Sequence, residues 1–194
     1  MKSAIASLAS AILLSACVTT GGGAGSDPNY DSANRKNVSV KQTTRGVEVT
    51  VNESVFFDIG KSELKAASND LIDRVATILK DRSKKDILIE GHTDSTGGAQ
   101  ANQRLSEQRA EAVKGALVKR GVAAKRMKTV GQGMNKPVAD NASPEGRQQN
   151  RRTQVVLLGE TTDNIGGENA VGYLEGAIAR LKDLGSAVLD AFRK

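Results

Sequence analysis

The chain has 194 residues and a formal net charge of +6, and 38% of its residues are hydrophobic, 26% charged and 3% aromatic. These values are typical of one globular domain with appendages and exclude a disordered polyelectrolyte. Nucleic-acid binding is not expected, because the basic residues are scattered and the aromatic residues are few and widely separated. The one Cys excludes an internal disulfide and the one His excludes the common His-rich metal sites, so we expect no metal and no cofactor.

The N-terminal segment has the pattern of an exported protein. Lys2 precedes an apolar run over residues 4–14, which is long enough for a signal-peptide core and too short to span a bilayer. Residues 14–17 read Leu-Ser-Ala-Cys, which resembles the bacterial lipobox, whose cysteine is acylated and becomes the mature N-terminus. The alternative is an ordinary cleavage site with a chance cysteine. We predict a signal peptide over residues 1–16 and lipidation at Cys17.

The residues after Cys17 indicate where the anchored protein is held. Bacterial lipoproteins with Asp after the cysteine often stay in the inner membrane, so Val18 implies, by the same resemblance, the periplasmic leaflet of the outer membrane. Residues 18–37 are rich in Gly, Ser, Asn and Asp and lack apolar periodicity. We therefore predict that residues 17–37 form a lipidated, flexible tether.

Residues 38–160 carry the patterns of a folded domain. Alternating Val residues on both sides of residues 44–46 predict two short strands within residues 38–51. Apolar residues at helical spacing predict an amphipathic helix over residues 62–82, with Ser62 as its N-cap. The patterns farther along predict a strand at residues 87–89, a helix at 102–120 with Gly121 as its stop, and strands at 126–131 and 153–158.

This order of elements predicts an α/β fold, an α+β sandwich with helices packed on one mixed sheet. The segment over residues 133–150 is long for a connection, and Pro137 and Pro144 argue against regular structure in it. Long ordered loops are often functional, but composition alone leaves a plain surface excursion open.

A turn containing glycines, residues 90–97, follows the strand at 87–89 and leads into the next helix, which is the usual ligand position in α/β folds. On that helix Asn102, Leu105 and Arg109 lie at i, i+3 and i+7 and share one face. This face borders the predicted core stripe. We therefore expect these side chains to lie at the edge of a groove.

Asp94 in the turn and Arg109 on the helix can then face each other across a pocket. Two opposite charges with no third partner are complementary to a zwitterion, since Asp94 accepts an ammonium and Arg109 holds a carboxylate. Backbone N–H groups around Thr96 and Gly97 can add contacts to an anion. The alternative is an ordinary salt bridge between Asp94 and Arg109.

Several short segments carry a family resemblance: Phe-Phe-Asp at 56–58, Ile-Glu-Gly-His-Thr-Asp at 89–94, residues 102–110, Gly-Gln-Gly at 131–133, and residues 145–152. In this order and spacing they resemble the OmpA-like C-terminal domain, a family that includes peptidoglycan-associated lipoproteins and flagellar stator proteins. The resemblance covers residues 44–159 and implies an OmpA-like β/α/β/α/β-β fold. It also implies non-covalent binding of peptidoglycan stem peptides that bear meso-diaminopimelate.

The same resemblance assigns roles to individual residues. It implies that Asp94 and Arg109 hold the free zwitterionic end of diaminopimelate and that Arg151 forms a further wall of the pocket. It places four more residues in the lining of this pocket: Thr96, Gly97, Asn102 and Leu105. Gly60 departs from the pattern, because some members carry a side chain there that reaches the pocket.

His92 lies between Glu90 and Asp94 and invites a catalytic interpretation as a general base. The sequence shows no Ser or Cys nucleophile pattern and too few ligands for zinc. Because Gly91 and Gly97 argue for a turn, we predict that His92 is a hydrogen-bonding residue that stabilises the turn. We expect a binding protein and not an enzyme.

Residues 161–194 are predicted to form a polar linker and an amphipathic helix over residues 168–192. Glycines within it weaken an isolated helix, so it needs a surface to pack on. Docking on its own domain, self-association, and contact with a partner protein or the membrane surface all remain open.

These patterns together predict an outer-membrane lipoprotein that binds peptidoglycan and ties the membrane to the cell wall. The alternative is an envelope signalling or assembly lipoprotein that captures a protein partner through its C-terminal helix, with wall binding secondary.

Overall fold

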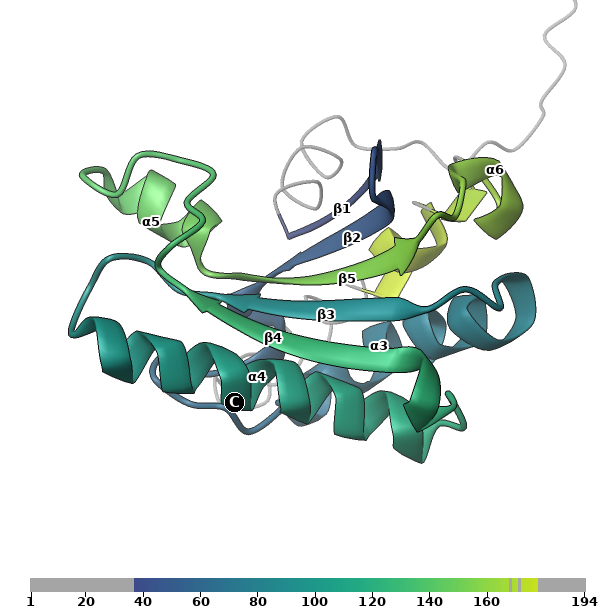
Figure 1. The fold of residues 1–194 in the computed structure, drawn as a ribbon, viewed down its shortest axis with the longest axis horizontal. Coiled ribbons are helices and arrows are strands. Elements are labelled where there is room, and N and C mark those ends of the chain that lie inside the picture. Colours follow the sequence, from purple (N-terminus) through teal and green to yellow (C-terminus); the bar gives the residue numbers. More distant parts are fainter. Residues whose placement is uncertain (1–36, 168, 171, 178–194) are drawn as a thin grey trace, which may run out of the picture.

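The computed structural model describes residues 37–167, 169–170 and 172–177, and these residues form a five-stranded sheet with helices packed against it (Figure 1). The strands are β1 (Val38–Thr43), β2 (Gly46–Asn52), β3 (Ile87–His92), β4 (Met127–Gly133) and β5 (Arg152–Leu158). Their order in the sheet is β1-β2-β5-β3-β4. Only β3 and β4 run parallel, and the other neighbours are antiparallel. The predicted fold class, helices on one mixed sheet, is confirmed.

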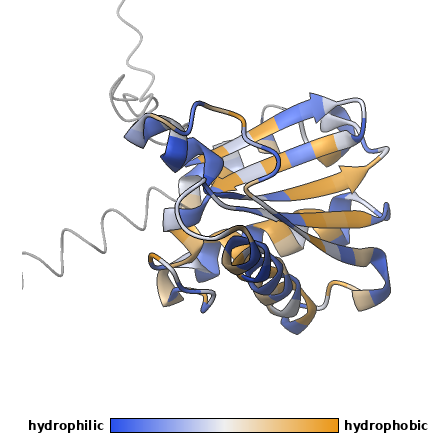
Figure 2. Ribbon diagram, turned by 60° about the vertical axis from the view of Figure 1, so that its left-hand side comes forward, coloured by the Kyte–Doolittle hydropathy of each residue, from blue (hydrophilic) through white to orange (hydrophobic). Residues whose placement is uncertain are grey.

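Two helices carry most of the packing on the sheet, α3 (Asn69–Thr77) and the longer α4 (Ala99–Lys119). The shorter elements are α2 (Glu53–Phe56), α5 (Pro144–Asn150), α6 (Thr162–Ile165), the 3₁₀ turns η1 (Ala66–Ser68) and η3 (Ala124–Arg126), and the π-helical turn η2 (Ile78–Arg82). Figure 2 shows long hydrophobic stretches in the strands and alternating character along α4. The core is largely aliphatic, with Phe56 and Phe57 in edge-to-face contact at 5.9 Å.

The strands predicted within residues 38–51 and at 87–89, 126–131 and 153–158 are present, as is the helix predicted at 102–120. The predicted start of the first helix at Ser62 is wrong. Leu64 forms a β-bridge with Phe57, and the Lys65 N–H donates to the Phe56 carbonyl at 2.8 Å. These contacts hold residues 62–65 extended, so the α-helix begins only at Asn69.

Residues 133–150 also differ from the prediction, because they contain the helix α5. Pro144 occupies its first turn, where a proline removes no hydrogen bond, and the Ser143 side chain caps it by accepting from the Gly146 N–H. Pro144 therefore starts a helix here.

The strand β3 extends through Gly91 to His92, so the predicted turn at Gly91 is wrong. A Cβ at Gly91 would lie 2.1 Å from the backbone oxygen of Ser106 on α4. The glycine therefore serves the close approach of α4 to the sheet. This approach brings the N-terminal half of α4 over the end of β3, where the candidate site lies.

The described part of the C-terminal segment packs on its own domain. Residues 169–170 and 172–177 are helical, and Ala170, Leu174 and Ala177 are buried in the same core as the sheet. The Arg74 guanidinium donates to the Tyr173 carbonyl at 2.5 Å and lies over its ring. Intramolecular docking therefore holds for this stretch, while residues 178–192 of the predicted helix lie outside the described residues.

The predicted signal peptide, Cys17 and nearly all of the predicted tether also lie outside the described residues. Among the helices that the structure does describe, none is both long enough and apolar enough to cross a membrane.

Candidate functional site

Arg109 on α4 is buried against α2, with 2% of its surface exposed. Its Nη2 lies 2.5 Å from Glu53 Oε1, and its Nε donates to the Lys61 carbonyl at 2.9 Å. The guanidinium carbon sits 5.2 Å from the centre of the Phe57 ring, within cation–π range. Burial raises the pKa of the Glu53 carboxyl and lowers the pKa of Arg109, in each case against the opposing pull of the partner charge. Arg109 is thus held rigidly.

Asp94 follows β3 and is paired with Arg151 at the end of α5. Arg151 Nη1 donates to Asp94 Oδ2 at 2.6 Å, and the Thr96 N–H donates to Asp94 Oδ1 at 2.8 Å. Burial acts to raise the pKa of the Asp94 carboxyl, but the hydrogen bonds from Arg151 and Thr96 outweigh it, so the pKa lies below its ordinary value. Asp94 is therefore a carboxylate at neutral pH.

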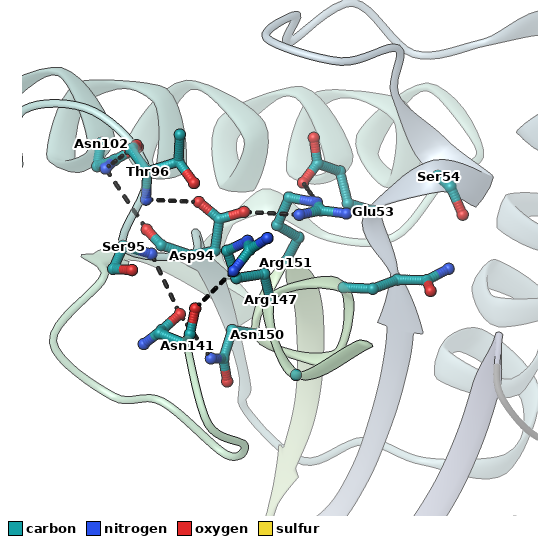
Figure 3. Close-up of polar contacts among 12 residues, drawn as sticks. Glu53, Ser54, Asp94, Ser95, Thr96, Asn102, Asn141, Arg147, Asn150 and Arg151 are labelled. Atoms are coloured by element: carbon teal, nitrogen blue, oxygen red, sulfur yellow. Dashed lines mark hydrogen bonds and ion pairs between the residues drawn. The ribbon is translucent and has the colours of Figure 1, made fainter. Parts of the chain in front are cut away.

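Arg151 joins the two pairs into one chain of alternating charge. Its Nε lies 3.5 Å from Glu53 Oε2, so the order is Arg109, Glu53, Arg151, Asp94, and Figure 3 shows the last three of these residues. The prediction that Asp94 and Arg109 stand without a third partner is wrong, and so is a direct salt bridge between them. Helix α2 places Glu53 beside Arg109, and α5 delivers Arg151 between Glu53 and Asp94, so each charge has an internal neighbour.

Two atoms in this charged chain are buried and held by opposite charge. Arg109 Nη2 lies 2.5 Å from Glu53 Oε1, and Glu53 Oε2 lies 3.5 Å from Arg151 Nε, although within the described residues Arg109 Nη2 and Glu53 Oε2 make no hydrogen bond of standard geometry. Arg151 is the more exposed of the two arginines, with 36% of its side chain accessible. A ligand with both an ammonium and a carboxylate would therefore meet the chain at Arg151 and Asp94.

Asn102 is brought to the site but points to the backbone. Its Nδ2 donates to the Thr96 carbonyl at 2.9 Å and to the Asp94 carbonyl at 3.5 Å, so it fixes the shape of the loop (Figure 3). The Thr96 N–H donates to the Asp94 carboxylate, so in this structure its anionic partner belongs to the protein itself. Thr96 and Gly97 are exposed, and Leu105 is half-buried.

The loop that precedes α5 is tied to the loop that carries Asp94. Asn141 Oδ1 accepts from the Ser95 N–H at 3.2 Å and from Asn150 Nδ2 at 2.9 Å (Figure 3). Arg147 donates to the Asn141 carbonyl at 2.8 Å. These bonds set the distance between Asp94 and Arg151, a function that sequence reasoning assigned to no residue.

Glu53 is the main functional residue that sequence reasoning missed. It follows Val47, Val49 and Val51 at the same alternating spacing, and these valines face the core. A carboxylate at the next core-facing position of the sequence therefore indicated a buried ion pair.

A shallow hollow of about 720 Å³ lies beside Arg109, between the loop after α2 and α4. Lys61, whose carbonyl accepts from Arg109, lines it together with Gly60 and Gln108. Gly60 has φ +71° and no other atom within 4 Å of a Cβ placed on it, so the hollow is open at this position.

Comparison with known proteins shows to which family this domain belongs. Residues 56–151 match the model of the OmpA family. The chain belongs to the OmpA family. The matched residues include Asp94, Arg109 and Arg151, and the resemblance inferred from the motifs is confirmed.

Three relatives show how far the similarity to other OmpA-family proteins extends. The chain is 40% identical to the probable lipoprotein YiaD of Escherichia coli over 62% of this chain and 55% of that protein. It is 43% identical to the peptidoglycan-binding protein ArfA of Mycobacterium bovis over 56% of this chain and 33% of that protein. Among solved structures, the cell wall anchor of the T6SS from Pseudomonas aeruginosa is 28% identical with a TM-score of 0.59, over 66% of this chain and 92% of that one. The chain thus covers less than two thirds of the length of each of these two curated relatives.

His92 belongs to a different polar cluster of this OmpA-family domain. It is the last residue of β3 and only 2% exposed, and within the described residues neither ring nitrogen makes a hydrogen bond of standard geometry. Because His92 belongs to β3, its predicted place in a turn is wrong. Burial, together with the nearby Arg152, lowers the pKa of His92 to about 3. A histidine with this pKa stays neutral at pH 7 and is a very weak base.

Proposed function

We propose that this protein is an envelope lipoprotein that binds peptidoglycan non-covalently, through the diaminopimelate of stem peptides. In this proposal the lipid on Cys17 holds it in the periplasmic leaflet of the outer membrane, so that it ties that membrane to the cell wall. Membership of the OmpA family supports the proposal, as do relatives named a lipoprotein, a peptidoglycan-binding protein and a cell wall anchor.

The observation that carries the proposal is the chain of alternating charges from Arg109 to Asp94. Its charges sum to zero, and its two ends, Arg109 and Asp94, carry opposite charges. The free end of diaminopimelate carries one ammonium and one carboxylate. The ammonium binds Asp94, and the carboxylate is held by Arg109 and Arg151 in charge-assisted hydrogen bonds. This arrangement performs recognition, and we propose that no bond is made or broken.

The proposal is tested by the binding of the purified full chain to sacculi. Asp94→Asn keeps the size of the side chain and removes its charge, and Arg151→Gln removes the outer arginine, whose side chain is 36% exposed. Each change removes charge-assisted hydrogen bonds worth about 1.5–3 kcal/mol, so affinity should fall about 10- to 150-fold. Arg104→Ala is the control, because Arg104 is exposed on the same helix α4 and, among the described residues, its side chain hydrogen-bonds only to Gln100.

Sacculi with amidated diaminopimelate test the ligand itself. Amidation removes the carboxylate, so wild-type binding should fall while the release of soluble muropeptides stays at background for every sacculus. Undiminished binding of both variants, or equal binding to amidated and free diaminopimelate, would refute the site.

The anchor is tested separately by membrane fractionation. Cys17→Ser removes the only cysteine and should release the protein into the soluble periplasmic fraction. Wild-type protein should stay attached to a membrane, because two or more acyl chains suffice for stable attachment. We expect that membrane to be the outer membrane. Recovery of wild type with the inner membrane would contradict the proposed location, while leaving the binding site untouched.

A further inference from the structure

A second cavity lies on the opposite face of the sheet from α3 and α4. Its volume is about 530 Å³, which is within the range of sites for small ligands. Glu48 and Thr50 of β2 line it, and they alternate with the valines that face the core. Strands β1 and β5 and the helix α5 contribute the other walls. No residue named so far for the diaminopimelate site lines this cavity.

The floor of this cavity is a fixed polar array. Gln154 Nε2 donates to Glu48 Oε2 and to Thr50 Oγ1, each at 3.2 Å, and Gln154 Oε1 accepts from Arg152 Nη2 at 3.3 Å. Arg152 is 5% exposed, and within the described residues it has no ion pair and its Nε has no hydrogen bond. The floor thus presents amide, hydroxyl and guanidinium groups whose positions are set before any ligand arrives.

Two glutamines and a valine on the rim of the cavity are available to a ligand. Gln148 and Gln149 on α5 are exposed, and their side-chain amides make no hydrogen bond to any other described residue. Val138 adds an apolar surface that is 60% exposed. The lining holds two cations and two carboxylates, so it favours a ligand without net charge. Amides and a hydroxyl beside one small apolar contact match an N-acetylated sugar, with its hydroxyl groups, acetamide and methyl.

The cavity and the diaminopimelate site meet where β2 ends and β5 begins. Asn52 lines the cavity and the next residue, Glu53, belongs to the charged chain; Arg152 lines the cavity and Arg151 belongs to the charged chain. Asn52 and Arg152 are paired across β2 and β5. The cavity therefore borders the charged chain at the same place on both strands. The two or three residues of a stem peptide that lead from its sugar to diaminopimelate extend about 7–10 Å, which suits neighbouring sites.

We propose that this cavity binds an N-acetylated sugar of the same peptidoglycan strand whose stem peptide occupies the charged chain. The inference rests on the proposed function, because it names a second part of the same ligand. No aromatic side chain lines the cavity for a sugar ring to stack on, so the subsite contributes modestly and acts with the first.

The test compares two ligands on the full chain in detergent by calorimetry: a stem tripeptide ending in diaminopimelate, and the same tripeptide on its N-acetylated disaccharide. The disaccharide-peptide should bind wild type about 3- to 10-fold more tightly, which corresponds to one or two neutral hydrogen bonds. Gln148→Ala/Gln149→Ala should abolish this advantage and leave the affinity for the tripeptide unchanged. Gln100→Ala, at an exposed glutamine on α4, is the matched control and should change neither value.

The outcomes separate the two proposals. Equal affinity of wild type for both ligands, or an advantage that survives the double substitution, overturns the sugar subsite while tripeptide binding upholds the proposed function. Failure of wild type to bind either ligand overturns both. In spectra of the amide groups, N-acetylglucosamine alone at millimolar concentration should shift Thr50 and Gln154, and shifts confined to other residues would also overturn the subsite.

Discussion

His92 is expected to make this protein sensitive to mild acid. Its pKa is about 3 in the folded chain against an ordinary value of 6.5, because burial and the nearby Arg152 disfavour the charged ring. A histidine with a depressed pKa binds fewer protons when folded than when unfolded. Acid therefore favours the unfolded chain, and stability falls from about pH 6.5 down to about pH 3. One pKa unit corresponds to about 1.4 kcal/mol, so lowering the pH from 7.5 to 5 should cost about 2 kcal/mol through this residue.

The measurement is urea unfolding, followed by circular dichroism, at pH 7.5 and at pH 5. Wild type should lose about 2 kcal/mol more unfolding free energy between these pH values than His92→Leu, which has no titrating group at this position. Carboxyl groups elsewhere titrate in both proteins, so they cancel in the comparison. Equal losses in the two proteins would refute the assignment of His92 as a buried, neutral ring.

Three further predictions concern packing around the site. Arg109→Ala should lower the free energy of unfolding by about 3–5 kcal/mol, because it leaves the Glu53 carboxylate buried beside a gap. Urea unfolding of the double variant Arg109→Ala/Glu53→Gln should show that part of the lost stability is restored. Gly91→Ala should lower the free energy of unfolding by about 1–3 kcal/mol, since the added Cβ meets the Ser106 oxygen. A urea midpoint equal to that of wild type would contradict this close approach. Leu174→Ala should cost about 2–5 kcal/mol if the C-terminal segment docks in solution as it does here, and no change would show that it does not.

Local periodicity accounts for the parts of the fold that the sequence predicted. The alternating valines of β2 and the apolar stripe of α4 each face the core at a regular spacing. Such a spacing can be recognised in the sequence without knowing the surface that packs against it. The failures have long-range causes. Nothing local to Ser62 shows that Leu64 will bridge to Phe57, and nothing local to Gly91 shows that the backbone of Ser106 will lie against it.

The sequence predicted three of the four charged residues of the site, but it predicted neither Glu53 nor the pairing of the charges. Asp94, Arg109 and Arg151 were all named from motifs, and the structure brings them into one cluster. Their partners depend on α2 and α5, whose positions follow from the order β2-β5 in the sheet and from the anchoring of Asn141. Residue spacing on one helix carries no information about such contacts, so the charged chain became visible only in three dimensions.

The two arginines of the charged chain differ in how easily each can move. The Arg109 side chain is 3% exposed and pairs with Glu53 in the interior, where separating the two charges would cost several kcal/mol. The Arg151 side chain is 36% exposed, so of the two arginines it is the one that can turn toward water. In the proposed binding mode, a ligand ammonium therefore enters by displacing Arg151 from Asp94, while Arg109 stays fixed. Since the released guanidinium remains next to the incoming carboxylate, the same movement that frees Asp94 supplies the second cation for the ligand.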